Sequence, residues 1–112
     1  MGDPVAHLTA VVDEHLAAAR TAEHGRSAHL LVHDGALRQS VIALTAGTVL
    51  DEHNTPLAAS LQVLRGRVRL TSADGDGAEL SAGQLCPVPR ERNGLTALED
   101  SAVLLTAVTA VA

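Results

Sequence analysis

The chain has 112 residues, enough for one domain with a single hydrophobic core. It contains no Phe, Tyr or Trp, so Leu, Val and Ala must fill that core, and Arg replaces Lys throughout, a bias typical of a GC-rich genome. Thirteen acidic residues against eight arginines give a net charge of −5, which argues against nucleic-acid binding because that function needs a basic surface.

The first element expected along the chain is a helix that opens at Asp3-Pro4. An aspartate N-cap accepts hydrogen bonds from first-turn amides, and proline is tolerated at the first helical position. Apolar residues then recur at intervals of three and four, forming one stripe of Val5, Leu8, Val12, Leu16 and Ala19. The helix is expected to end near residues 21–23, before Gly25. Residues 1–26 are therefore predicted to be an N-terminal helix and linker.

From residue 27 onward the pattern changes to short strands. Asp34-Gly35 predicts a hairpin turn between strands at 28–33 and 36–44. Further strands are expected at 48–52, 58–64, 67–71, 78–80, 85–88, 95–98 and 101–111, separated by segments rich in Gly, Pro, Asn and Asp. Many short strands at this spacing are typical of a β-sandwich or barrel. Residues 27–112 are therefore predicted to form one all-β unit.

Two glycine-anchored segments resemble the two sequence motifs of the cupin family. The first runs from Gly47 through His53 to Gly66, and the second from Gly83 to Pro89. The Leu-Gln-Val-Leu-Arg-Gly run that ends at Gly66 is similar to the hairpin that closes the first motif. The resemblance covers roughly residues 36–112. It implies an all-β, cupin-type jelly-roll barrel, here with one N-terminal α-helix.

The metal ligands of cupins are nearly all missing from these motifs. In metal-binding members the first motif supplies a His-x-His pair and a Glu, and the second supplies another His. Here His53 matches the first His, whereas Thr55 and Ala59 stand at the second His and the Glu. Asn93 lies where the last His is expected. Since one or two protein ligands seldom hold a metal, no cofactor is predicted. The candidates for any divalent metal are His53 and Asp51, which share one strand face about 6–7 Å apart.

The same residues predict a ligand site that needs no metal. His53, Thr55 and Asn93 would supply the few polar groups of an otherwise apolar barrel interior. Arg90 lies in the loop after the second motif, where it is a candidate to pair with a small carboxylate, although such arginines more often pair with local acids such as Glu91 and remain exposed. Cys86, the single cysteine, is expected to be a buried structural residue because nothing nearby in the sequence supplies a base.

Three functions follow as hypotheses. The preferred one is a non-enzymatic barrel that binds a small apolar molecule or acts as a regulatory or sensor domain. The second is a metal-dependent enzyme of the oxygenase or isomerase type with a non-standard site around His53. The third is a structural dimerisation module that uses the apolar segment 102–112 and the stripe of the helix.

The expected partners are a small-molecule ligand and a second copy in a homodimer, with no nucleic acid and no membrane. The first 25 residues lack the pattern of a signal peptide, and a lone cysteine suits a reducing compartment. These features predict a cytoplasmic protein.

Overall fold

The computed structural model describes residues 5–52, 57–91 and 93–109, and within them it has one helix and nine strands. The helix is α1 (Leu8–Thr21). The strands are β1 (Arg26–Asp34), β2 (Leu37–Leu44), β3 (Val49–Glu52), β4 (Ala58–Arg65), β5 (Arg67–Ser72), β6 (Gly77–Ser81), β7 (Leu85–Pro87), β8 (Asn93–Ala97) and β9 (Ser101–Val108).

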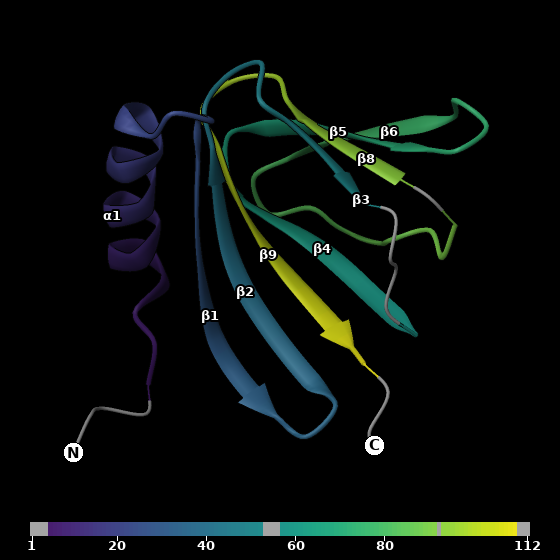
Figure 1. Ribbon diagram of the computed structural model, residues 1–112, viewed down its shortest axis with the longest axis horizontal. Helices are drawn as coiled ribbons and strands as arrows, with labels where there is room; N and C mark the ends of the chain where they lie inside the picture. Colours follow the sequence, from purple (N-terminus) through teal and green to yellow (C-terminus); the bar gives the residue numbers. More distant parts are fainter. Residues whose placement is uncertain (1–4, 53–56, 92, 110–112) are drawn as a thin grey trace.

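The strands form two antiparallel sheets. One has five strands in the order β1-β2-β9-β4-β7, and the other has four in the order β3-β8-β5-β6. Strands distant in sequence are neighbours, as β2 and β9 are, which is the topology of a jelly roll. Figure 1 shows the strands of both sheets fanning out from the end that carries the β2–β3 and β8–β9 connections.

The two sheets enclose an aliphatic core. Alternate residues of the facing strands point inward, as the period of two along a strand requires. Each fully buried Leu or Val contributes about 1.5–3 kcal/mol. The buried members are Leu44, Leu61, Val63, Val68, Leu70, Leu80, Leu95, Ala97 and Val103.

Helix α1 covers the outer face of the five-stranded sheet, beside β1 in Figure 1. Its buried residues pack in a second apolar cluster with three residues of β2 and β9; together they are Val12, Leu16, Ala19, Val41, Ala43 and Ala102. The predicted stripe is therefore the surface that fixes the helix to the sheet. Its first two members, Val5 and Leu8, remain 63% and 36% exposed. No helix among residues 5–52, 57–91 and 93–109 has the length and apolar character needed to cross a membrane.

The predicted start of the helix is wrong. The helix begins at Leu8 with His7 as its N-cap, whereas Asp3 and Pro4 lie outside the described residues. Val5 precedes the helix and its side chain is 63% exposed. The first deeply buried residue of the stripe is Val12. Packing on the sheet therefore stabilises the helical conformation only from about one turn before Val12. Burial, and not the capping signal, sets this boundary.

The strand predictions are confirmed to within one to three residues at each boundary in the described parts of the chain. The hairpin at Asp34-Gly35 is present, with Gly35 in the left-handed region at φ +57°. Gly66 also has a positive φ, +83°, and a side chain there would overlap Ser101 Oγ and the Asp100 carbonyl. The glycine of the first motif is therefore required by both backbone conformation and space.

Candidate functional site

The inner face of β4 carries Ala59 where the cupin resemblance implies a metal-binding glutamate. Ala59 alternates with Leu61 and Val63, which are buried between the sheets, and it pairs with Ala107 of β9. A methyl group thus stands at the inward position that a carboxylate would need. This position cannot contribute a ligand to a metal ion.

Asn93 is the first residue of β8, and it is buried with 7% exposure. It alternates with Leu95 and Ala97, so it lies on the inner face. Its Nδ2 atom donates to the carbonyl oxygens of Pro89 and Glu91, both at 3.3 Å. The amide therefore fastens the loop between β7 and β8. This is the loop that holds Arg90, whose side chain is exposed.

Asp51 lies on the outer face of the four-stranded sheet. It is exposed and pairs with Gly94, whereas its neighbour Leu50 packs against the core. Since successive residues of a strand face opposite ways, Asp51 points away from the space between the sheets. Its proposed partner His53, and Thr55 with it, lie outside the described residues.

Cys86 lies on the inner face of β7, opposite Leu61 of β4, and packs against the core. Burial raises the pKa of its thiol, so the neutral form is favoured at neutral pH. The side chain is half-buried, whereas a buried residue was predicted, and its structural role stays a prediction. Across the described ranges, no cluster of three or more His, Cys, Asp or Glu side chains could hold a metal ion. The donor set described does not fit a cupin metal centre.

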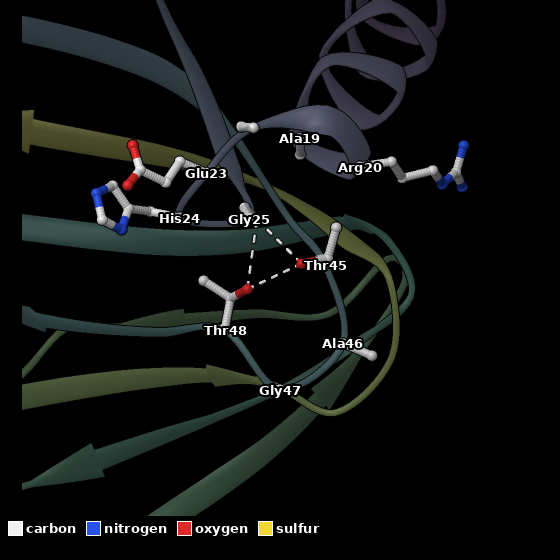
Figure 2. Close-up of a pocket in the computed structure, with 10 residues that line it drawn as sticks. Ala19, Arg20, Glu23, His24, Gly25, Thr45, Ala46, Gly47 and Thr48 are labelled. Atoms are coloured by element: carbon white, nitrogen blue, oxygen red, sulfur yellow. Dashed lines mark hydrogen bonds between the residues drawn. The ribbon is translucent and has the colours of Figure 1, made fainter.

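A groove of about 450 Å³ lies where α1 ends and the β2–β3 connection begins (Figure 2). Thr45 Oγ1 and Thr48 Oγ1 are 3.0 Å apart, and they donate to the Gly25 carbonyl at 3.3 and 3.4 Å. Gly25 has φ +68°, and a Cβ atom there would overlap both hydroxyl groups. These polar atoms bind one another and hold the helix exit against the sheet. No local pattern predicts this contact, because Gly25 is 20 and 23 residues away from its two partners.

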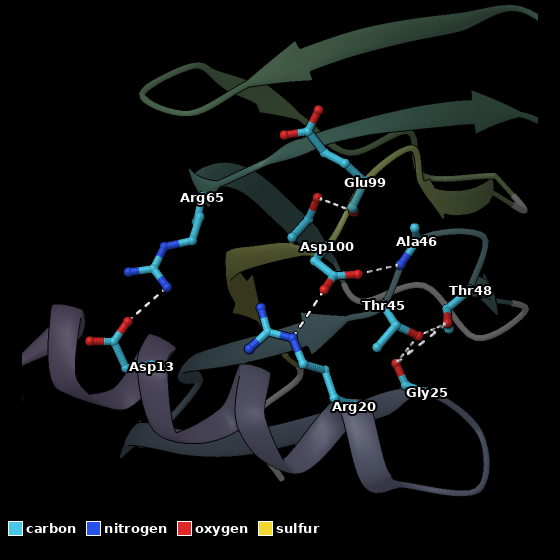
Figure 3. A network of polar contacts seen from close by, with 10 residues as sticks. Asp13, Arg20, Gly25, Thr45, Ala46, Thr48, Arg65, Glu99 and Asp100 are labelled. Carbon is cyan, nitrogen blue, oxygen red and sulfur yellow. Dashed lines mark hydrogen bonds and ion pairs between the residues drawn. The ribbon is translucent and has the colours of Figure 1, made fainter.

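A polar network joins α1 to the same end of the sheets (Figure 3). Asp100 accepts hydrogen bonds from the Ala46 amide at 2.9 Å and from Arg20 Nε at 3.1 Å. These two donors lower the pKa of the Asp100 carboxyl group. Arg65 forms a second link to the helix, with Nη1 2.7 Å from Asp13 Oδ1. The network therefore joins α1 to the strand connections at this end of the sheets.

No family model and no curated protein matches the sequence. Solved structures do match the fold. A conserved protein of unknown function, SPY1581 from Streptococcus pyogenes, is 25% identical with a TM-score of 0.70, over 81% of this chain and 80% of that one. A cupin superfamily protein from Desulfitobacterium hafniense DCB-2 is 14% identical with a TM-score of 0.68, over 76% and 78%.

An enzyme also shares the architecture. Salicylate 1,2-dioxygenase from Pseudaminobacter salicylatoxidans is 19% identical with a TM-score of 0.74, over 88% of this chain and 33% of that one. At these identities the likeness concerns fold and not activity. The predicted all-β jelly roll with one N-terminal helix is confirmed.

Proposed function

Because this chain has the cupin fold, we propose that it binds a small, mainly apolar molecule between its two sheets, without a metal ion held by the protein. The observation that carries the proposal is Ala59, which places a methyl group on the inner face at the position of the cupin glutamate. Removal of that carboxylate takes away a metal ligand and leaves apolar surface in its place.

The side chains at the margin of the core suit such a ligand. Five residues are partly buried and pack against the core: Ile42, Leu50, Cys86, Val88 and Leu105. A lining of this kind, with few polar groups, is what small-molecule sites use to bind apolar surface. The neutral thiol of Cys86 adds no nucleophile to it. Binding without chemistry fits a sensor or carrier role.

The experiment compares a residue that faces inward with its neighbour that faces outward. Ala59→Leu would fill space between the sheets, whereas Ala58→Leu adds the same volume to an exposed position of the same strand. 1-Octanol is the probe, titrated by calorimetry. We expect Ala59→Leu to weaken its binding by about tenfold or more, equal to about 1.4 kcal/mol, and Ala58→Leu to leave it unchanged. Equal effects of the two variants would place the ligand elsewhere.

A further inference from the structure

The β1–β2 hairpin end of the five-stranded sheet carries two basic side chains on its inner face. Arg38 of β2 alternates with Ile42 and Leu44 of the core, so it belongs to the inward set. His33 of β1 pairs with Arg38 across the hairpin and shares that face. Both side chains are exposed. A guanidinium and an imidazole therefore stand beside each other at the rim of the proposed ligand space.

Arg38 lies in the same cross-strand row as the site of the lost glutamate. Arg38 pairs with Ala107 of β9, and Ala107 pairs with Ala59 of β4. Neighbouring strands are about 4.8 Å apart, so the backbones of Arg38 and Ala59 are about 10 Å apart on one face. Ala107 is the one residue between them in this row. Because alanine side chains are small, the long side chain of Arg38 can lie across this row without steric overlap.

The Arg38 guanidinium is available for a ligand. Its fellow arginines Arg20, Arg65 and Arg67 form ion pairs with acidic residues. In the parts of the chain that the structure describes, no hydrogen bond or ion pair engages Arg38. Asp34, the acid of the same hairpin, pairs with Leu37 and lies on the opposite face.

Apolar surface lies directly beside these basic groups. Leu30 pairs with Ser40 on the inner face, and its side chain is 44% exposed. Ser40 pairs in turn with Leu105, which packs against the core. Leu30 at the rim and Leu105 at the core thus lie on either side of Ser40 in one cross-strand row, next to the strand position of Arg38. This arrangement matches a molecule with an apolar body and one anionic end.

We propose that the ligand is an amphipathic carboxylate, with its aliphatic body between the sheets and its carboxylate on Arg38. The planar guanidinium offers two parallel N–H donors to the two carboxylate oxygens, which a neutral molecule of equal size cannot use. His33 supplies a further donor at the rim. This inference rests on the proposed function, because it assigns the head group of the molecule bound there.

The test compares octanoate with 1-octanol, which share a chain length and differ in charge. Calorimetric titrations use wild type, Arg38→Gln, Arg38→Lys and the control Arg69→Gln, a β5 arginine on the outer face of the four-stranded sheet. We expect wild type and the control to prefer octanoate by about tenfold. Arg38→Gln should remove this preference without weakening 1-octanol, and Arg38→Lys should retain part of it.

The outcomes separate the two proposals. If 1-octanol binds and octanoate shows no advantage, or keeps its advantage in Arg38→Gln, the carboxylate inference is wrong and the proposed function stands. If neither probe binds wild type, the proposed function fails and the inference fails with it. Arg38 is exposed, so its variants are expected to fold; circular dichroism and melting temperature confirm this before titration.

Discussion

Asp100 Oδ2 accepts a hydrogen bond from Arg20 Nε at 3.1 Å, joining the last turn of α1 to the β8–β9 loop eighty residues later. The other oxygen of the same carboxylate accepts the Ala46 amide from the β2–β3 connection at 2.9 Å. One side chain therefore holds three segments that are distant in sequence. The ionised form is the one that both donors stabilise.

This arrangement predicts a pH-dependent contribution of Asp100 to stability. Its pKa is lowered in the folded protein, chiefly by the Ala46 amide and then by Arg20. A depressed pKa stabilises the fold above the unfolded value of about 3.9, and this contribution is lost as the pH falls through the folded value. Asp100→Asn should therefore lower the melting temperature at pH 6 and have a smaller effect near pH 3. A difference that stays constant between these pH values would contradict the assignment.

Gly66 should tolerate a side chain much less well than Gly75. Both have positive φ, +83° and +91°, but a Cβ atom at Gly66 would overlap Ser101 and Asp100, whereas none of the described atoms lies within 4 Å of one at Gly75. Gly75→Ala should cost about 1–2 kcal/mol for the backbone conformation alone. Gly66→Ala should cost clearly more, because steric overlap adds to it. Urea unfolding measures both, and equal losses would show that space at Gly66 is unimportant.

Leu16 should be an essential part of the core although it lies on the helix outside the two sheets. Its side chain is 1% exposed, against 36% for Leu8, about two turns earlier on the same helix. Leu16→Ala should cost about 2–5 kcal/mol through lost burial and the cavity left behind. Leu8→Ala serves as the control and should cost well under half of that. A loss below about 1 kcal/mol for Leu16→Ala would mean that α1 is only loosely attached.

The protein is also expected to bind no stoichiometric metal. The interior lacks two carboxylates that a metal site could use. Ala59 has a methyl group in place of one, and Asp51 faces outward. Untagged protein purified without chelators and supplied with Fe, Mn, Ni and Zn should carry well under one ion per chain by elemental analysis. Near-stoichiometric metal that disappears in His53→Ala would contradict this and restore the metal-enzyme hypothesis.

The strands could be predicted from the sequence because their signals are local. Alternating apolar residues and turn residues such as Gly35 define each strand within a few positions. The helix start could not be predicted correctly, since it depends on where the sheet offers a surface to Val12. A capping residue upstream carries no information about that surface.

The site was harder to predict because its geometry depends on strand phase and on distant pairing. Strand alternation predicts that Leu50 and Asp51 face opposite sides of the sheet. Only the packing of Leu50 on the core shows that the side of Leu50 is the inner one. Arg38 gave no signal for a site. Its row is completed by Ala107 and Ala59 from two other strands, and those neighbours are known only once the sheet order is known.

The most direct test of the central claim is a titration of the protein with 1-octanol after exhaustive dialysis against EDTA, repeated after metal supply. If binding depends on aliphatic surface and on no metal, the dissociation constant of 1-octanol should be the same in both samples. The amide shifts that it causes in NMR spectra should then be centred on β4, β7 and β9. Binding that vanishes in EDTA and returns with metal would contradict the account.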